Sequence, residues 1–423
     1  MKISLPKGTK DILPDEMIGW RFVENVFYDI CVNSGYGEIR TPVFEYTNLF
    51  DRGVGDSTDI VQKEMYTFND KGGRSLTLRP EGTAGVARSF IEKGMASLPQ
   101  PVKLFYMITA YRYENVQKGR YREFNQLGAE IFGAASPNAD VEVISLLNNF
   151  FTKLGLGKLS LEINSIGCPQ CRSAYNEKLK EYYSGRIDGM CADCKRRFGT
   201  NPIRLIDCKN ESCIAASVDV PLMLDNICGE CASHFSGVRT GLNSLDIKYT
   251  VNPRIVRGLD YYTKTVFEFV SENVGTQGTV CGGGRYDGLV ESLGGSGTPG
   301  IGFSLGVERL FMELESNNII PGEKTVPEIY FVTIGEKAYA YARKLSCALR
   351  KADVYTEMDL LGRSVKAQMK DADRKKARYV LVVGDDEIKQ NKAQIKIMET
   401  GELKDVSLDS IYKRILEKKV QGV

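Results

Sequence analysis

Two apolar runs joined by a long charged segment constrain the fold of this 423-residue chain more than any other feature. The runs, 102–109 and 127–132, have the composition of β-strands, and the segment between them is rich in Arg, Lys and Gln. Side chains two positions apart on a strand point the same way, so Arg112 and Glu114 are expected to share one face of the sheet. A cation and an anion placed together there indicate a loop that holds phosphates. A surface hairpin with a solvated, charged tip would give the same pattern.

Three segments of the chain carry longer motifs. They read QKGRYREFNQLGAEIFG at 117–133, RGLDYYTKTVFEF at 257–269 and GTPGIGFSLGVERL at 297–310. The first and third resemble motifs 2 and 3 of the class II aminoacyl-tRNA synthetases, and all three resemble the histidyl-tRNA synthetase family within that class. The likeness starts at GTKDILP, residues 8–14, and is weakest in the cysteine-rich middle. It implies an enzyme that ligates L-histidine to tRNA(His) through a histidyl-adenylate and converts ATP to AMP and pyrophosphate.

Composition excludes several kinds of protein and of chemistry. The apolar runs fall well short of the ~20 residues that a membrane span needs, and the N-terminus lacks the apolar core of a secretory signal. We therefore expect a cytoplasmic protein with neither a membrane nor DNA as partner. The chain holds one histidine, His234, which nearly excludes catalysis by a histidine base or a Ser-His-Asp triad. Arg, Lys, Glu, Asp, Tyr or a bound ion must then supply the chemistry.

Residue patterns and the resemblance together predict an α+β catalytic domain with an antiparallel sheet of the class II type. Apolar residues three and four apart predict helices over 15–35 and 140–155. Residues 65–68 and 75–78 alternate around a turn and predict a hairpin, after which Thr83 is placed to cap a helix. Further strands are expected at 38–46, 159–164, 246–251 and 265–270.

The chain divides into three parts. The catalytic domain is expected from 1–164 and 246–320, interrupted by a helical insertion at 165–245 that holds eight of the eleven cysteines. After a linker at 315–326, strands and helices alternate, which predicts a C-terminal α/β domain over 328–423 with a mixed, mostly parallel sheet. By resemblance, the insertion lies against the acceptor arm of the tRNA and the C-terminal domain binds the anticodon.

Charge is uneven along the chain. The net charge is +2, but residues 328–423 carry 20 Lys+Arg against 15 Asp+Glu, which makes this end the better candidate for contact with an acidic polymer. A basic stripe is expected on its second helix, although a solvated face would give the same excess. The stripe consists of Arg363, Lys366, Lys370, Arg374 and Arg378.

The resemblance assigns the phosphate side of the active site. Amino-acid activation brings two anions together, so it needs cations around the α-phosphate of ATP. Arg112 and Arg257 are the catalytic residues expected there, and Arg309 is expected to hold the γ-phosphate, with Mg²⁺ between the β and γ oxygens. Glu114 and Arg120 complete the residues expected to bind ATP.

The resemblance also assigns the histidine pocket, which needs partners for the amino group and for both ring nitrogens. The amino end is assigned to Glu81, Thr83 and Gln126. The imidazole is assigned to Glu130, Tyr262 and Tyr286. Gly82, Arg257 and Tyr261 complete the set. Such a polar pocket discriminates strongly, because a wrong ligand leaves buried groups unpaired.

Two further assignments concern the partners of the protein. The charged loop departs from the family pattern at 115–117, which reads Asn-Val-Gln where many relatives carry Arg-Pro-Gln. We therefore expect Gln117 and Arg122 to carry more of the contact with the acceptor end of the tRNA. The strand that contains Pro42 matches motif 1, whose proline lies at the dimer contact, and this implies a homodimer.

Clustered cysteines predict a metal. Disulfides are not expected in a reducing compartment, and each CxxC pair places two thiolates where one tetrahedral ion needs them. The eight cysteines suffice for two Cys₄ zinc sites, and His234, three residues past Cys231, is a candidate to replace one ligand. Reduced cysteines that merely pack are the alternative. The candidate ligands are Cys168, Cys171, Cys191, Cys194, Cys208, Cys213, Cys228 and Cys231.

Two other functions have related sequences. A non-catalytic regulatory subunit of ATP phosphoribosyltransferase shares the synthetase fold, but it typically lacks the C-terminal domain and departs from the arginine-bearing 257–262 motif. A sensor of uncharged tRNA would come fused to a kinase, and nothing in this chain resembles one.

Overall fold

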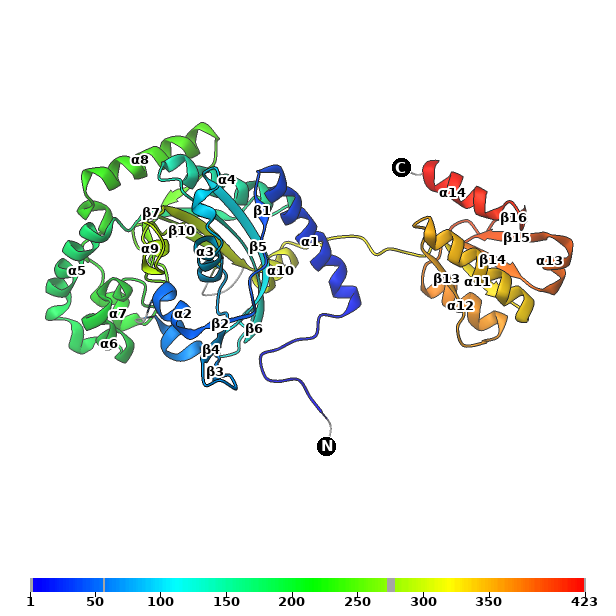
Figure 1. Cartoon of the computed structure of the whole chain (residues 1–423), viewed down its shortest axis with the longest axis horizontal. Helices are drawn as coiled ribbons and strands as arrows, with labels where there is room; N and C mark the ends of the chain where they lie inside the picture. Colours follow the sequence, from blue (N-terminus) through cyan, green and yellow to red (C-terminus); the bar gives the residue numbers. More distant parts are fainter. Residues whose placement is uncertain (1–2, 56–57, 272–277, 422–423) are drawn as a thin grey trace. The chain divides into compact units, whose positions relative to one another are not determined.

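The computed structural model describes residues 3–55, 58–271 and 278–421 and divides into two compact units, one up to Gly322 and one from Glu323 onward (Figure 1). Among the helices in these ranges, none is both long enough and apolar enough to cross a membrane.

A mainly antiparallel sheet organises the first unit. Over the described residues it has eight strands in the order β1-β5-β6-β11-β10-β9-β7-β8, and its parallel pairs are the two outermost. The strands are β1 (Gly37–Glu38), β5 (Val102–Tyr111), β6 (Glu123–Phe132), β11 (Gly300–Gly306), β10 (Thr279–Arg285), β9 (Thr263–Val270), β7 (Ser160–Ser165) and β8 (Thr250–Val251). The two apolar runs of the opening motif pair as β5 and β6, which confirms the predicted strands. The strand expected at 246–251 is reduced to the two residues of β8.

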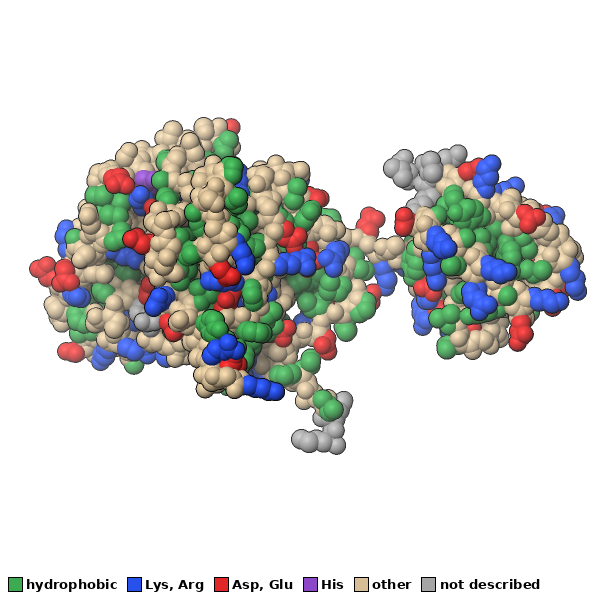
Figure 2. Space-filling model, in the orientation of Figure 1, with side chains coloured by type: hydrophobic (Ala, Val, Ile, Leu, Met, Phe, Trp, Pro, Cys, Tyr) green, Lys and Arg blue, Asp and Glu red, His purple; other side chains and the backbone are tan. Residues whose placement is uncertain are grey.

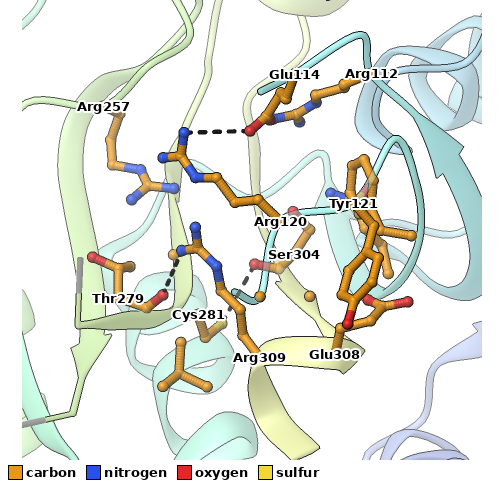
Figure 3. A pocket seen from close by; sticks show the side chains of 16 residues that line it. Arg112, Glu114, Arg120, Tyr121, Arg257, Thr279, Cys281, Ser304, Glu308 and Arg309 are labelled. Atoms are coloured by element: carbon orange, nitrogen blue, oxygen red, sulfur yellow. Dashed lines mark hydrogen bonds and ion pairs between the residues drawn. The ribbon is translucent and has the colours of Figure 1, made fainter. Parts of the chain in front are cut away.

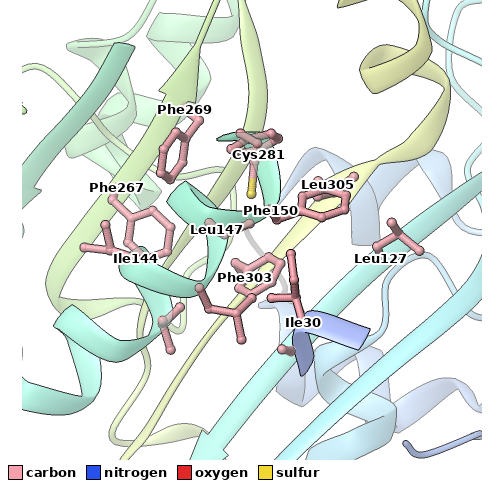
Figure 4. Close-up of a cluster of buried hydrophobic side chains, with 14 of the residues drawn as sticks. Ile30, Leu127, Ile144, Leu147, Phe150, Phe267, Phe269, Cys281, Phe303 and Leu305 are labelled. Atoms are coloured by element: carbon pink, nitrogen blue, oxygen red, sulfur yellow. The ribbon is translucent and has the colours of Figure 1, made fainter. Parts of the chain in front are cut away.

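Helices cover both faces of this sheet. On one face lie α1 (Pro14–Asn33), α4 (Pro137–Lys153), α8 (Gly229–Ser244) and α10 (Val307–Ser316). Their apolar stripes bury a large core against the strands, in which Ile30, Ile144 and Phe150 meet side chains of β9 and β11 (Figure 4). On the other face, α3 (Thr83–Glu92) and α9 (Leu289–Ser292) form a second core. Space left uncovered between these elements holds the candidate site.

A small second sheet continues the first unit. β2 (Phe44–Tyr46), β4 (Ser75–Leu78) and β3 (Thr67–Asn69) are antiparallel, and the predicted hairpin is confirmed with its first strand beginning two residues later than expected. α2 (Thr47–Val54) follows β2, and helical turns lie at Ile60–Glu64 and Met95–Ser97.

The cysteine-rich segment is helical, as predicted. It contains α5 (Pro169–Ser184), α6 (Ala192–Thr200), α7 (Glu211–Ala216) and α8, with helical turns at Ile187–Gly189, Pro202–Leu205 and Met223–Asn226. A separate core holds most of the cysteines. By contrast, Phe235, Val238 and Leu242 of α8 belong to the large core of the main sheet. The last helix of the segment therefore packs as part of the main layer.

The second unit has its own five-stranded sheet over the described residues, in the order β13-β12-β14-β15-β16. The strands are β12 (Ile329–Thr333), β13 (Thr356–Met358), β14 (Tyr379–Val383), β15 (Lys392–Ile397) and β16 (Leu403–Ser407), and the helices are α11 (Glu336–Lys351), α12 (Val365–Arg374), α13 (Asp385–Gln390) and α14 (Ile411–Gln421). The mixed sheet is confirmed, but two pairings are parallel and two antiparallel, because β15 and β16 form a hairpin.

The predicted basic stripe on α12 is interrupted. Arg363 precedes the helix, Arg378 follows it, and Arg363 and Arg374 both ion-pair with Asp371. The cations are thus partly neutralised inside the unit.

Candidate active site

A polar cavity of about 260 Å³ lies over the middle of the main sheet. Its floor is made by β6, β10 and β11, where Gly282 pairs with Ser304 and Gly306 pairs with Gln126. The small residues on these strands keep the floor open. The other lining residues are Arg112, Glu114, Gly119, Arg120, Tyr121, Phe124, Arg257, Thr279, Val280, Cys281, Glu308 and Arg309.

Four arginines from three segments converge on this cavity. Figure 3 shows Arg120, Arg257 and Arg309 directed into the same space, and Arg112 lies beside Glu114 at its edge. Arg112 follows β5, Arg120 lies in the β5–β6 loop, Arg257 precedes β9 and Arg309 lies in α10. Among the described lining residues, these cations outnumber the carboxylates Glu114 and Glu308. The cavity is therefore suited to a ligand with several negative charges.

Glu114 organises two of these arginines. Its carboxylate lies 3.7 Å from Nη1 of Arg112 and 3.3 Å from Nη1 of Arg120, while Nε of Arg112 donates to the Pro80 carbonyl at 2.8 Å. Arg112 and Glu114 thus lie together as predicted, but not on a face of the sheet, because β5 ends at Tyr111 and both residues belong to the loop that follows.

Arg309 lies on the opposite side of the cavity. Its guanidinium donates to the Thr279 carbonyl at 3.0 Å. Burial lowers the pKa of Arg309, and the nearby Arg120 and Arg112 lower it further. A bound anion would relieve the repulsion between these positive charges.

Arg257 is held from the sheet. Its partial burial lowers the pKa, but its ion pair with Glu268 of β9 raises the pKa above the ordinary value overall. A Cβ at Gly282 would collide with the guanidinium, so the glycine run of β10 is what lets Arg257 lie flat on the strand. Within the part of the chain that the structure describes, its buried Nε has no hydrogen-bond partner.

The residues predicted for the histidine pocket form a largely buried group beside the cavity, and this group contains two carboxylates, Glu81 and Glu130. Glu81 accepts hydrogen bonds from the backbone N–H groups of Thr83 and Ala84, each at 2.7 Å. Glu130 accepts from the Thr83 hydroxyl at 2.7 Å and from the Tyr106 hydroxyl at 3.0 Å. The hydroxyl of Tyr286 also donates to Glu130. The predicted capping role of Thr83 is wrong, because Thr83 is the first residue of α3 and the Glu81 carboxylate caps the helix instead.

The remaining predicted pocket residues lie in the same place. Tyr261 packs against Tyr262 and Tyr286, with ring centroids 4.7 and 5.6 Å apart. Gln126 is buried at the border between pocket and cavity, and its Oε1 has no partner among the described residues. An unpaired buried amide oxygen needs a donor, which an incoming ligand can supply.

Tyr106 is a pocket residue that the sequence analysis missed. It is buried on β5, and a Cβ at Gly82 or Gly128 would collide with its ring. Gly128 lies directly across the strand pair from Tyr106. A tyrosine that faces a glycine on the neighbouring strand indicates a ring lying over that glycine. This pairing can be recognised only when the register of the two strands is known.

Both carboxyl groups, Glu81 and Glu130, have pKa values above their ordinary value. Burial raises the pKa of Glu130 to about 8, hydrogen bonds from Tyr286 and Thr83 oppose the rise, and the nearby Glu81 adds to it. Burial also raises the pKa of Glu81. Buried carboxylates that lack a paired cation in the described structure form a site prepared for a cationic or hydrogen-donating ligand.

Stability without ligand should therefore depend on pH through Glu130. Its folded-state pKa, about 8, exceeds the unfolded value of about 4.3, so its contribution is fully present below about pH 4.3 and is lost as the pH rises through 8. In urea unfolding between pH 5 and 8, we expect the free energy of unfolding of the wild type to fall relative to Glu130→Gln by up to about 1.4 kcal/mol per pH unit. Parallel curves for the two proteins would contradict this.

The two residues assigned to the tRNA acceptor end differ in their surroundings. Gln117 is exposed, and its backbone pairs with Arg120. Arg122 stacks on the Tyr113 ring at 3.8 Å, and its backbone N–H donates to the Gly8 carbonyl at 2.8 Å. Gln117 is thus free to meet a partner in solution, while Arg122 fixes the loop to the N-terminal segment.

The eight cysteines of the helical segment form two groups of four. One group joins Cys168 and Cys171 to Cys228 and Cys231, and the other joins Cys191 and Cys194 to Cys208 and Cys213. Within each group all Sγ atoms lie within 4.8 Å of one another, which fits a tetrahedral Cys₄ set.

Local geometry favours a thiolate at one cysteine of each group, whereas burial raises the pKa of Cys194 and of Cys231 in the absence of an ion. Cys168, Cys191 and Cys228 each stand immediately before a helix. A hydrogen bond from the backbone of Cys231 lowers the pKa of Cys228 to about 7, and Cys191 reaches the same value although burial opposes it. Thiolates at about neutral pH are the form that binds a metal.

The prediction that His234 replaces one ligand is wrong. Its Nε2 lies 3.1 Å from Asp140 of α4, and Arg285 binds the same carboxylate. His234 belongs to neither cysteine group, because its position on α8 faces the main core while Cys231 faces the cysteine core.

Comparisons with known proteins address the same residues. A histidyl-tRNA synthetase family model matches residues 8–170 and 218–310, and an anticodon binding domain model matches residues 328–418. A histidine–tRNA ligase of Acetivibrio thermocellus is 59% identical over 415 residues, which is 98% of this chain and 100% of that protein. The crystal structure of apo S. aureus histidyl-tRNA synthetase is 40% identical with a TM-score of 0.84, and the match covers 98% of this chain and 100% of that one.

A more distant structure, from Bacillus halodurans, is described as an ATP phosphoribosyltransferase regulatory subunit/histidyl-tRNA synthetase. It is 21% identical with a TM-score of 0.62, covering 91% of this chain and 99% of that one. This likeness concerns the fold alone.

Proposed function

Because the chain belongs to the histidyl-tRNA synthetase family, we propose that it ligates L-histidine to tRNA(His) with consumption of ATP, through a histidyl-adenylate. The observation that carries this is the placement of an arginine-lined cavity beside two buried carboxylates, Glu81 and Glu130. The cavity would accept a polyphosphate, and the carboxylates would bind a small ligand that carries an amine and ring N–H donors.

In the first step, a carboxylate oxygen of histidine attacks the α-phosphorus of ATP in line. A carboxyl–phosphate bond forms, the bond between the α-phosphorus and the bridging oxygen breaks, and pyrophosphate leaves. Arg112 and Arg257 would neutralise the charge on the α-phosphate, and Arg309 would hold the γ-phosphate. Arg120, kept in place by Glu114, would contact the phosphate chain. Mg²⁺ bound with ATP would supply positive charge that helps to neutralise the leaving pyrophosphate.

Selection of histidine follows from the buried pocket. Glu81, Thr83 and the unpaired amide oxygen of Gln126 would face the amino group. Glu130, in contact with Tyr286 and next to Tyr262, would face the imidazole. Gly82 and Tyr261 shape the walls. Glu130 already accepts hydrogen bonds from three hydroxyls, so an amino acid without ring donors would bury this carboxyl group without adding a donor to it, which would weaken binding of that amino acid.

The protein would contact tRNA at three places. Residues 328–423 would bind the anticodon, the loop between β5 and β6 would meet the acceptor end, and the insertion would lie against the acceptor arm. We assign the catalytic domain to 1–164 and 246–320 and the insertion to 165–245, as the sequence predicts.

Replacement of Gln117 by alanine is expected to lower tRNA charging about tenfold and to leave adenylate formation unchanged. The side chain is exposed on the loop and lies outside the residues that line the cavity. Steady-state charging and histidine-dependent pyrophosphate exchange, measured on the same preparation, check this. Equal losses in both assays would count against an acceptor-end role.

We also propose a homodimer. Val43, Phe44, Tyr46 and Phe68 on or beside the small three-stranded sheet are 43% to 53% exposed, and Figure 2 shows hydrophobic side chains at the surface over this region. Exposed apolar side chains gathered on one sheet favour contact with another protein surface. Pro42 precedes this sheet, where the family places the dimer contact. Sedimentation equilibrium at micromolar concentration tests the assembly.

We expect about two zinc ions per chain in protein purified without chelator, one for each Cys₄ group. Metal analysis measures this directly. Cys228→Ser and Cys208→Ser should each remove about one ion, because each takes a ligand from a different group. Cys347→Ser is the matched control, since Cys347 is exposed and lies outside both groups. A metal ratio near zero, with stability unchanged after chelation, would leave packing as the role of these cysteines.

Histidine-dependent exchange of pyrophosphate into ATP tests the proposed function as a whole. A non-catalytic regulatory subunit of ATP phosphoribosyltransferase would show none. That alternative is not favoured, because the curated ligase matches the full chain and residues 328–418 match the anticodon binding domain model.

A further inference from the structure

The segments of chain that carry the two cysteine groups also contact the 257–262 motif. Arg172 directly follows Cys171, and its guanidinium donates to two backbone carbonyls of that motif. The distances are 2.9 and 3.1 Å to the Asp260 oxygen and 2.7 Å to the Tyr262 oxygen. Such a planar fork can satisfy two carbonyls at once, which fixes their spacing as well as their position.

The second cysteine group supplies another contact to the same motif. Asn201 follows α6, the helix that begins after Cys191 and contains Cys194. Its side-chain amide donates to the Asp260 carboxylate at 2.7 Å. Asp260 is therefore held through its backbone from one group and through its side chain from the other.

Two backbone hydrogen bonds beside Cys168 add to these contacts. We call the contacts of Arg172, Asn201 and Gly167 with residues 260–264 the brace. The Lys264 N–H donates to the Gly167 carbonyl and the Ile166 N–H donates to the Lys264 carbonyl, both at 2.8 Å. Gly167 has a φ of +65°, and a Cβ there would collide with Cys171 and Met223. The turn into α5 thus depends on a glycine packed against a cysteine of the first group.

The motif itself has no regular secondary structure to fix it. Residues 252–262 lie between β8 and β9 without helix or strand. Tyr261 and Tyr262 of this stretch line the histidine pocket, whereas Arg257 is held separately by Glu268 and by close contact with Gly282. Loss of the brace should therefore displace the pocket tyrosines more than the phosphate-binding arginine.

We propose that Arg172 is a positioning residue for histidine binding. It holds the backbone of residues 260–262, and its own place in α5 is fixed by the neighbouring cysteine group. The inference rests on the proposed histidine activation and specifies what sets its affinity for the amino acid. Arg172 does not line the cavity, and it contacts the pocket residue Tyr262 only at the backbone carbonyl, so its effect passes through the backbone of Asp260 and Tyr262.

Pyrophosphate exchange with Arg172→Gln, Arg172→Lys and a control tests this. We expect Arg172→Gln to raise the KM for histidine about tenfold and the KM for ATP less than about twofold. Arg172→Lys should recover part of the loss, because an ammonium can still donate to one of the carbonyls. Arg186→Gln is the matched control, since Arg186 is exposed at the end of the same helix and binds the Tyr182 carbonyl.

A wild-type KM for histidine in Arg172→Gln would overturn the inference, and so would equal rises in both KM values. Absence of histidine-dependent exchange in the wild type would instead refute the proposed function, so the two failures are distinguishable.

Removal of metal tests whether the cysteine groups support the contacts of Arg172. We expect removal of zinc from the wild type by a chelator, followed by exchange into chelator-free buffer with Mg²⁺ for the assay, to raise the KM for histidine to a similar extent. It should add little to Arg172→Gln, because both changes release the same backbone. Multiplicative effects of chelation and Arg172→Gln would overturn the link between the cysteine groups and the histidine pocket.

Discussion

Replacement of Arg257 by alanine is expected to abolish detectable histidyl-adenylate formation while the protein stays folded. Its guanidinium lies in the cavity where the α-phosphate is proposed to bind. Loss of one preorganised donor to a developing negative charge costs about 3 to 4 kcal/mol, or roughly 10²- to 10³-fold in rate, and loss of a full charge should cost more. Histidine-dependent pyrophosphate exchange measures the effect, and near-wild-type exchange would contradict the assignment.

Two controls separate this effect from damage to the fold. Arg254→Ala removes an exposed arginine three positions earlier, which lies outside the cavity lining, and it should retain exchange. Arg257→Ala also leaves Glu268 without its cation, although Thr279 still donates to Glu268 at 2.7 Å. The double change Arg257→Ala with Glu268→Gln removes that unpaired charge. If exchange stays lost in the double variant while its melting temperature returns to the wild-type value, the missing cation is the cause.

Local patterns predicted the elements that frame the site, because their signals lie within a few residues. The apolar alternation of β5 and β6 and the hairpin of β3 and β4 were readable in this way. Strand β16 and helix α13 carry no such signal, since neither shows a clear apolar face: two of the five residues of β16 are apolar, and α13 has one apolar residue in six.

Contacts between distant segments could not be read from the sequence. The cysteine pairs predicted two Cys₄ sets, but not that Cys168 would meet Cys228 across most of the segment. His234 was misplaced for the same reason, because closeness in sequence to Cys231 does not decide which core a helix residue faces. The position of Tyr106 depends on the strand register, and the contacts of Glu114 with two arginines depend on the path of the loop. Neither can be predicted from local sequence patterns.

Deletion of residues 328–423 is expected to spare adenylate formation and to lower charging of full-length tRNA about 100-fold or more. The cores of the second unit are built from its own residues, and every residue assigned to activation precedes Leu310. The first unit should therefore keep its sheet, cavity and pocket without the second. A 100-fold loss corresponds to about 2.7 kcal/mol of binding that the anticodon contacts would supply.

An RNA minihelix that contains the acceptor stem and lacks the anticodon provides the decisive comparison. The deletion variant and the full chain should charge it at similar rates, because the proposed acceptor-end residues, Gln117 and Arg122, lie in the first unit. They should differ in charging full-length tRNA, where the full chain gains from the second contact. If the deletion variant charges full-length tRNA normally, the second unit does not bind the anticodon. If it loses exchange as well, the first unit depends on the second for its fold, and the separation of activation from anticodon binding fails.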